Sequence, residues 1–289
     1  MVRKITNMLS FMLGRHTLWR LGRSMYLAAR ADTVNDMQFN GERTLQRSLV
    51  SWFVASKKPL VIFDVGANIG DWTLNMLEEL AGTDVTSRVS IFSFEPVPAT
   101  HRTLQGRIST HGLGSLVHLV PLALSSNEGP AEMFVIGDNA GTNSLHVDPM
   151  KTGGNFVPVR KTTADSYCLE NSIEVIHYLK CDTEGHDMEV LYGASRLFRE
   201  KRIMACQFEY NYLWIYSRHY FKDVFDFIKG TGYCVGKITP GGVELYEQWH
   251  PELDRFIAGN YLLLHPDALN WFVTHKGQFD AYNTYVAIK

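Results

Sequence analysis

The chain has few cysteines, no long apolar run and no excess of charge of one sign. Its four cysteines lie far apart, form no C-x-x-C pair and have no histidine at zinc-binding spacing. They therefore indicate buried thiols in a reducing compartment, which predicts a cytoplasmic location without a disulfide framework. No run approaches the ~20 apolar residues of a membrane-spanning helix. The formal net charge is -2, so no overall field attracts nucleic acid.

The most informative stretch is 60–70, with the sequence LVIFDVGANIG. A short run rich in Val, Ile and Phe that glycines close is typical of a strand buried on both faces. Gly66 and Gly70 allow a tight turn, and residues 71–80 then repeat apolar residues at helical spacing. A strand, a glycine turn and a helix in this order open a nucleotide-binding α/β unit.

Two substitutions in the turn indicate which nucleotide binds. Asn68 occupies the place of the second glycine of the dinucleotide fingerprint G-x-G-x-x-G, and Asp71 occupies the third. A carboxylate there would repel a diphosphate, which disfavours an NAD-dependent oxidoreductase, whereas Asp64, Asn68 and Asp71 suit an ammonium and a sulfonium. S-adenosylmethionine carries both charges and no phosphate. Glu95 follows the next strand, 89–94, where it is placed to accept both ribose hydroxyls, unless it is an ordinary surface acid.

Three motifs resemble those of FkbM-type methyltransferases in order and spacing. They are Asp64-Val-Gly-Ala-Asn-Ile-Gly70, Phe94-Glu-Pro96 and Leu179-Lys-Cys-Asp-Thr-Glu-Gly-His186. The resemblance covers residues 58–265, and the last motif is the most specific. It implies a class I fold, S-adenosylmethionine as the donor and, usually, methylation of a hydroxyl on a sugar, polyketide or similar metabolite. Cys181-Asp-Thr-Glu stands where the family more commonly has Ile-Asp-Val-Glu, which leaves both acids intact.

The order of elements predicts an α/β class I methyltransferase fold, Rossmann-like, with a seven-stranded, mostly parallel sheet and helices on both faces. We assign residues 59–289 to the methyltransferase domain and 1–58 to an N-terminal helical extension. Beyond the two strands above, further strands are expected at 116–120, 173–179, 203–208, 233–238 and 260–264, the last two as an antiparallel pair. Short strands at 131–136 and 156–160 flank the polar stretch 138–144, which is either a surface loop or a lid.

Residues 1–30 contain basic residues and no acid. Apolar residues from Ile5 to Leu13 recur at i, i+3, i+4, i+7 and i+8, on one face of a helix. Arg15 interrupts the apolar stretch and no small-residue cleavage site follows, so a secretory signal is disfavoured. This helix either docks on the catalytic domain and covers the site, which we favour, or makes a peripheral contact with an anionic membrane.

The predicted donor site combines the first turn with later strand ends. Ala123 is included because ligands collect beyond the C-terminal ends of strands. The donor-site residues are Asp64, Gly66, Asn68, Gly70, Thr73, Glu95, Pro96, Ala123 and Asp182.

Methyl transfer to a hydroxyl needs a base or a metal, because a protonated hydroxyl is a poor nucleophile. The predicted catalytic residues are Asp182, Glu184 and His186. We expect Asp182 to contact the donor or acceptor, Glu184 to orient the hydroxyl or assist its deprotonation, and His186 to be a candidate base with an ordinary pKa near ~6.5. The alternative is that these acids have only a structural role, because carboxylates stabilise the first turn of a helix. We accept this interpretation for Asp187. A second hypothesis places a divalent cation, with magnesium favoured by oxygen ligands, between Asp182 and Glu209.

An acceptor would meet polar and aromatic residues. Residues 209–220 form the most aromatic stretch, where rings can stack on a sugar or simply pack the following helix. The predicted acceptor contacts are Asn143, Ser144, Glu209, Tyr210 and Tyr212. We therefore predict an S-adenosylmethionine-dependent O-methyltransferase with a small-molecule or sugar-containing acceptor and no nucleic-acid partner. An N-methyltransferase of the same fold and a non-catalytic membrane-associated module stay open, and the oligomeric state is not indicated.

Overall fold

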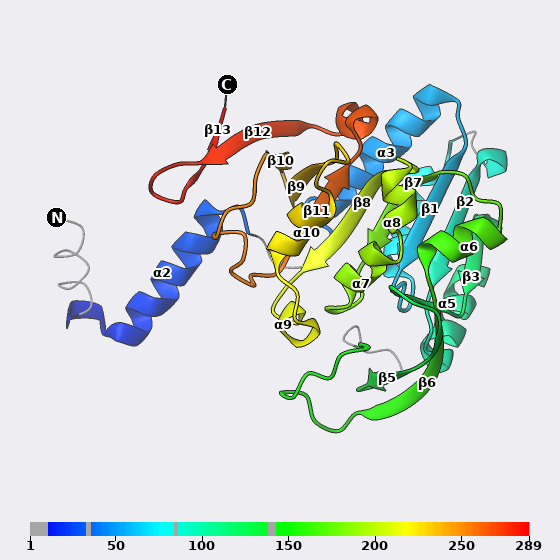
Figure 1. The fold of residues 1–289 in the computed structure, drawn as a ribbon, viewed down its shortest axis with the longest axis horizontal. Coiled ribbons are helices and arrows are strands. Elements are labelled where there is room, and N and C mark those ends of the chain that lie inside the picture. The colour runs from blue at the N-terminus through cyan, green and yellow to red at the C-terminus, as the bar shows by residue number, and fades with distance from the viewer. Residues whose placement is uncertain (1–10, 33–35, 84–85, 138–142, 289) are drawn as a thin grey trace.

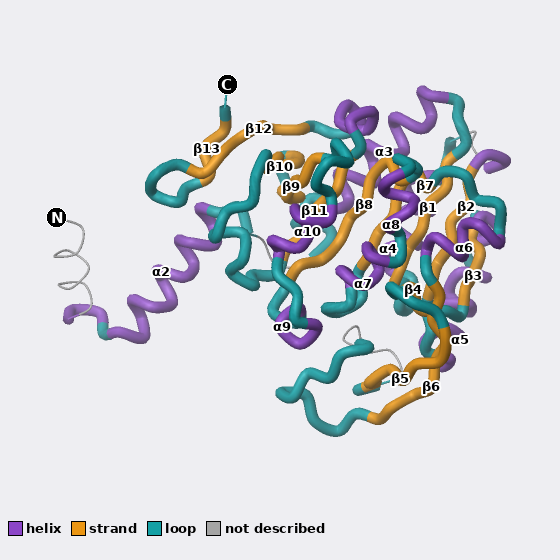
Figure 2. Tube along the Cα trace, viewed as in Figure 1, coloured by secondary structure: helices purple, strands orange, loops and turns teal. Residues whose placement is uncertain are grey.

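The computed structural model of the chain describes residues 11–32, 36–83, 86–137 and 143–288 (Figure 1). A central layer of strands has helices on both sides (Figure 2). Seven strands have the predicted class I order, β3-β2-β1-β7-β8-β11-β9, and β11 is the one strand of the seven that runs in the reverse direction. Their bounds are β1 Leu60–Val65, β2 Val89–Phe94, β3 Val117–Val120, β7 Ile176–Cys181, β8 Ile203–Tyr210, β9 Cys234–Thr239 and β11 Gly259–Leu264. The predicted fold class is confirmed.

The sheet continues beyond the seven predicted strands. β10 (Gly242–Tyr246) returns from β9 as a hairpin, and β12 (Thr274–Phe279) and β13 (Tyr285–Ala287) extend the edge to ten strands. The predicted antiparallel pairing of β9 with β11 is confirmed, but β10 lies between them in sequence and pairs with the other edge of β9. The three extra strands lie at the edge of the sheet, several strands away from β1 and its turn.

The apolar residues of β1 divide between the two faces of the sheet, as a strand buried on both sides requires. Phe63 belongs to one core cluster and Ile62 to the other, and both are fully buried. The helices and short 3-10 turns whose bounds lie within the described residues are α2 Arg15–Ala29, α3 Glu42–Ser56, α4 Asp71–Leu80, α5 Pro98–Ser109, α6 Ala164–Glu170, α7 Asp187–Tyr192, α8 Ser195–Arg199, α9 Trp214–Ser217, α10 Phe221–Phe227, η1 Thr86–Arg88, η2 Gly114–Leu116 and η3 Pro266–Trp271. None of the described helices has the length and apolarity to cross a bilayer.

The two helices of the predicted extension differ in their packing. α3 buries Leu45, Leu49 and Phe53, spaced four residues apart, in the same core cluster as Ile62 of β1. Each such side chain contributes about 1.5–3 kcal/mol of burial, so α3 is firmly attached to the sheet. α2 buries no residue. The helix predicted from Ile5 to Leu13 lies mostly in residues 1–10, which are outside the described part of the chain, so its docking over the site stays a prediction.

A second, three-stranded sheet stands beyond the C-terminal ends of the main strands (Figure 1). It has the order β4-β6-β5, with bounds β4 Ala123–Leu124, β5 Gly129–Val135 and β6 Asn155–Thr162. The two short strands predicted here are confirmed. Of the polar stretch between them, residues 138–142 lie outside the described residues, while Asn143 and Ser144 are placed against the site.

All four cysteines are free thiols, three of them buried and Cys234 half-buried. This agrees with the predicted absence of disulfides. The predicted cytoplasmic location stays a prediction.

Candidate active site

A cavity of about 550 Å³ opens where β1, β2 and β7 end. The predicted site residues that line it are Gly66, Asn68, Glu95, Pro96, Ala123, Asn143, Asp182, Glu184 and His186. The predicted residues outside its lining are Asp64, Gly70, Thr73, Ser144, Glu209, Tyr210 and Tyr212. The cavity thus joins the predicted donor residues to the predicted catalytic residues.

The first turn is pressed against the end of β7. Gly66 has a φ of +77°, and a Cβ built on it would lie 2.0 Å from the carbonyl oxygen of Asp182. Asn68 also adopts a left-handed conformation, with φ of 50°. Its side-chain oxygen is buried and has no hydrogen-bond partner among the described residues. The turn therefore presents an unused acceptor in the lining of the cavity.

Asp64 and Thr73 support this turn from below. The Thr73 hydroxyl donates to Asp64 Oδ2 at 2.6 Å, and both residues are fully buried. Burial raises the pKa of Asp64. The structure does not bring either side chain, or Gly70, to the lining of the cavity. Asp71, which we expected to repel a diphosphate, instead forms an ion pair of 2.7 Å with Arg107, so its charge is already compensated.

Lys180 is a buried cation beneath the site that the predictions did not include. Its ammonium lies 3.2 Å from Asp182 Oδ2 and 3.7 Å from Asp64 Oδ1. Burial alone would lower the pKa of Lys180, but Asp182, Asp64 and Glu42 together raise it. A lysine inside an apolar strand is a usable sequence signal, because a buried charge needs a partner.

Glu95 is held rigidly at the cavity wall. Its two carboxylate oxygens accept the backbone N–H groups of Asn68 at 3.0 Å and Val97 at 2.9 Å. Burial raises the pKa of Glu95 to about 7, and the two N–H groups oppose that rise. The fixed carboxylate keeps lone pairs that can accept the hydroxyls of a ligand.

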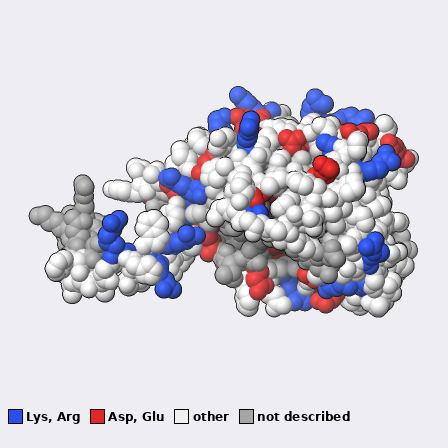
Figure 3. Space-filling view, turned by 90° about the horizontal axis from the view of Figure 1, so that it is seen from below, with Lys and Arg blue, Asp and Glu red and all other residues white. Residues whose placement is uncertain are grey.

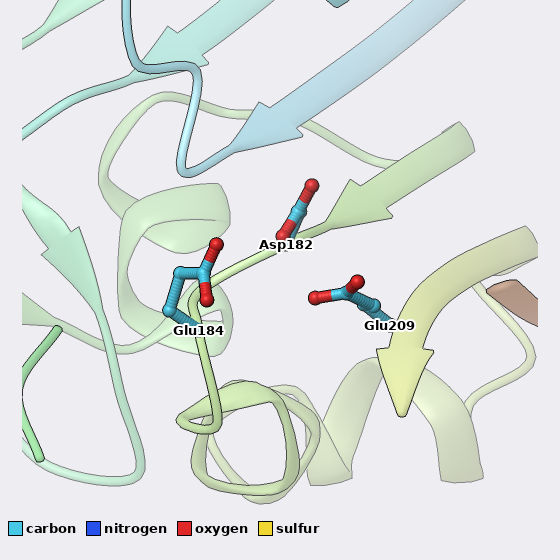
Figure 4. Close-up of side chains that lie close together, drawn as sticks. All are labelled: Asp182, Glu184 and Glu209. Atoms are coloured by element: carbon cyan, nitrogen blue, oxygen red, sulfur yellow. The ribbon is translucent and has the colours of Figure 1, made fainter. Parts of the chain in front are cut away.

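Three carboxylates converge at the other side of the site. Asp182, Glu184 and Glu209 point toward one another (Figure 4), with ligand oxygens all within 4.8 Å. Burial and the charge of Asp182 raise the pKa of Glu184 to about 8. Burial and both neighbouring acids also raise the pKa of Glu209. Carboxylates this close share protons or a cation, because mutual repulsion disfavours full ionisation. The predicted pair Asp182 and Glu209 is thus brought together, with Glu184 as a third member.

His186 lines the cavity with both ring nitrogens occupied. Nε2 lies 3.0 Å from Ser125 Oγ, and Nδ1 lies 3.0 Å from His146 Nε2. Burial, with a smaller effect of His146, lowers the pKa of His186 to about 3. His186 is therefore neutral, and Glu184 is the better placed candidate base because its pKa lies closer to neutrality.

Asn143 and Ser144 both shape the cavity wall through contacts with the backbone. Asn143 Oδ1 accepts the N–H of Ile136 at 3.1 Å. The Ser144 hydroxyl donates to the carbonyl oxygen of Glu184 at 2.8 Å. That bond holds Glu184 in a left-handed conformation with φ of 54°, which is uncommon for a residue other than glycine. Ser144 thus positions the candidate base.

The side chains at the start of the aromatic segment 209–220 point in different directions, because β8 extends two residues further than predicted. Side chains alternate along a strand, so Glu209 joins the carboxylates while Tyr210 enters the core. Tyr210 is fully buried, and its hydroxyl donates to Asp254 at 3.0 Å. Tyr212 is 42% exposed and donates to Asp148 at 2.9 Å. Neither tyrosine is part of the cavity lining.

Apart from Ala123 and its neighbours, which we expected to contact the adenine, the sequence reasoning missed the apolar wall of the cavity. This wall consists of Val65, Phe94, Leu122, Leu124, Met133 and Leu145. Leu122 and Leu124 flank the predicted Ala123, and their position after the third strand was the available signal. Met133 and Leu145 come from the small sheet and the bridge beside it, whose position no local pattern reveals.

The strand order with one reversed strand, and the glycine turn and acid at the ends of β1 and β2, define a class I methyltransferase fold. A family model described as the methyltransferase FkbM domain matches residues 64–235. The match covers more than half of the chain, which therefore belongs to the FkbM methyltransferase family. Among curated proteins, no similar sequence was found.

Several solved structures are similar to the chain at low sequence identity. Methyltransferase FkbM from Methylobacillus flagellatus KT has a TM-score of 0.45 and 16% identity, over 71% of this chain and 43% of that one. Precorrin-6y C5,15-methyltransferase from Geobacter metallireducens GS-15 has a TM-score of 0.36 and 12% identity, over 75% and 85% of the two chains. The N-terminal domain of human METTL16, in complex with SAH, has a TM-score of 0.40 and 9% identity, over 74% and 66%. The matched region therefore covers less than half of the Methylobacillus flagellatus protein. At such scores the likenesses add nothing to the fold assignment, which depends on the strand order.

Proposed function

We propose that the protein transfers a methyl group from S-adenosylmethionine to a hydroxyl of a small-molecule or glycan acceptor. One observation carries this proposal: a single cavity has the fixed carboxylate of Glu95 on one wall and the candidate base Glu184 on another. The first suits the ribose of a nucleoside donor, and the second suits the deprotonation of an acceptor.

The cavity fits a cationic nucleoside better than a diphosphate. The unpartnered Asn68 oxygen can accept an N–H of the donor. Glu95 can accept the ribose hydroxyls, and Leu124 and Met133 offer an apolar wall to a purine. Among the described residues that line the cavity there is no lysine or arginine to hold a diphosphate. These features favour S-adenosylmethionine over a nicotinamide dinucleotide.

The carboxylates support a hydroxyl as the acceptor. Bound S-adenosylmethionine supplies an electrophilic methyl group. Glu184, once ionised, accepts the hydroxyl proton, and its raised pKa of about 8 makes it a stronger base than an exposed glutamate. The Lys180 ammonium lies 3.2 Å from Asp182, beside Glu184. An amine acceptor would need less help from a base, so this pKa favours O-methylation over the N-methylation that the fold also permits.

Magnesium is a second part of this proposal. Asp182, Glu184 and Glu209 offer the oxygen ligands that magnesium prefers. Lys180 already supplies one positive charge beneath them, so the cluster can also be balanced by protons. Activity that chelator removes and magnesium restores would support the metal, and full activity in excess chelator would exclude it.

The test uses the full chain, isotopically labelled S-adenosylmethionine and a panel of hydroxyl and amine acceptors. We expect calorimetry to show S-adenosylmethionine binding without NAD binding, and mass spectrometry to show a methyl ether as product. Glu184→Gln should lose turnover and keep donor binding, while the exposed strand residue Glu132, as Glu132→Gln, serves as the matched control. Stabilisation of the protein by NAD alone would overturn the donor assignment, and a methylamine product would overturn O-methylation.

A further inference from the structure

Helix α2 projects from the body of the protein (Figure 1), and contacts at its C-terminal end join it to the domain. The Tyr26 hydroxyl donates to Glu252 at 2.5 Å, and Arg30 pairs with Asp32 at 2.7 Å. The buried ammonium of Lys237 donates to the Arg30 carbonyl oxygen at 2.7 Å and pairs with Asp32. These partly buried contacts fix the direction of the helix, although no residue of α2 itself is fully buried.

An apolar stripe runs along the projecting helix. Leu18, Leu21 and Met25 stand at i, i+3 and i+7, on one face. Met25 is 68% exposed, and the neighbouring Trp19 is 73% exposed. A groove between α2 and the segment around Phe256 is lined by the half-buried Leu18, whereas Leu21 and Met25 are not part of its lining. Contiguous exposed apolar side chains of this kind mark an interaction surface.

The charge of the helix selects the occupant. Arg20 and Arg23 lie on the side of the helix away from the stripe, Arg15 lies at its border three residues before Leu18, and residues 1–31 contain no acid. Figure 3 shows Lys and Arg side chains on the projecting arm. A stripe of leucine and methionine on a helix that also carries an exposed tryptophan, three arginines and no acid is the pattern of a helix that lies in the headgroup layer of an anionic bilayer. An uncharged surface would leave the basic face without a partner.

We propose that α2 is a docking helix for an anionic membrane surface, which its apolar stripe enters while its arginines pair with lipid phosphates. The contact is peripheral, because no described helix can cross the bilayer. It is independent of the proposed methyl transfer, since no residue of α2 lines the cavity.

The test is flotation of the full chain with phosphatidylcholine vesicles, with and without phosphatidylglycerol. We expect binding only to the anionic vesicles, weakened by salt. Leu21→Glu with Met25→Glu should abolish flotation, and Arg15→Glu with Arg20→Glu should weaken it at least about 25-fold, fivefold for the loss of each arginine. Arg199→Glu with Lys229→Glu, an equal charge change at exposed positions elsewhere, is the matched control and should float like the wild type.

The variants leave the core intact because α2 buries nothing, and thermal unfolding with donor calorimetry on the same samples checks this. Failure of donor binding in the wild type would count against the proposed function only. Equal binding to both vesicle types, or unchanged flotation of the Leu21 and Met25 variant, would overturn the membrane proposal. The membrane proposal would also be overturned if the wild type were a dimer that does not float and the Leu21 and Met25 variant were a monomer. The stripe would then be a contact between two copies of the chain.

Discussion

Replacing Gly66 with alanine tests whether the first turn must approach β7 as closely as the structure shows. The φ of +77° costs an alanine about 1–2 kcal/mol. A Cβ only 2.0 Å from the Asp182 carbonyl oxygen adds an overpacking cost of about 1–3 kcal/mol. Urea denaturation should therefore show a loss of about 2–5 kcal/mol in the free energy of unfolding. Donor binding should also be lost, because Gly66 and Asp182 both line the cavity.

Gly82 provides a matched control. Its φ is +78°, but a Cβ there would meet nothing within 4 Å. Gly82→Ala should therefore cost only about 1–2 kcal/mol, the conformational part, and leave donor binding intact. Equal destabilisation by the two substitutions, with donor affinity kept in both, would refute the argument that the turn and the end of β7 are in forced contact.

Three further predictions concern single side chains. Glu95→Gln places an amide where two N–H groups donate, so donor affinity measured by calorimetry should fall roughly 10- to 100-fold; an unchanged affinity would contradict the ribose role. The rate with a hydroxyl acceptor should rise with pH through about 8, the pKa of Glu184, and Glu184→Gln should remove that limb of the profile. Because the folded pKa of Glu184 lies above its ordinary value of 4.5, its contribution to stability is complete below that value and is lost as the pH rises through about 8. Tyr210→Phe should cost about 1 kcal/mol of stability through the lost bond to Asp254 and leave donor binding unchanged; a loss of turnover without a loss of stability would instead restore Tyr210 as an acceptor contact.

The carboxylate cluster shows how far strand order alone can position a site. Asp182 and Glu209 follow two parallel strands, whose C-terminal ends meet at one edge of the sheet, so their proximity is predictable. Glu184 joins them through its left-handed backbone, which Ser144 of the small sheet's bridge holds in place. That contact joins residues forty positions apart and leaves no local pattern in the sequence.

The sequence by itself determined the strand, turn and helix around Gly66, the acid after β2, and the seven-stranded class, because apolar alternation and glycine placement act over a few residues. Only the tertiary structure decided which side chains reach the cavity. Asp64 and Tyr210 turn inward, Lys180 is buried beneath the acids, and α2 projects outward. Each of these outcomes depends on strand length and on contacts between distant segments, where burial and charge compensation outweigh local preference.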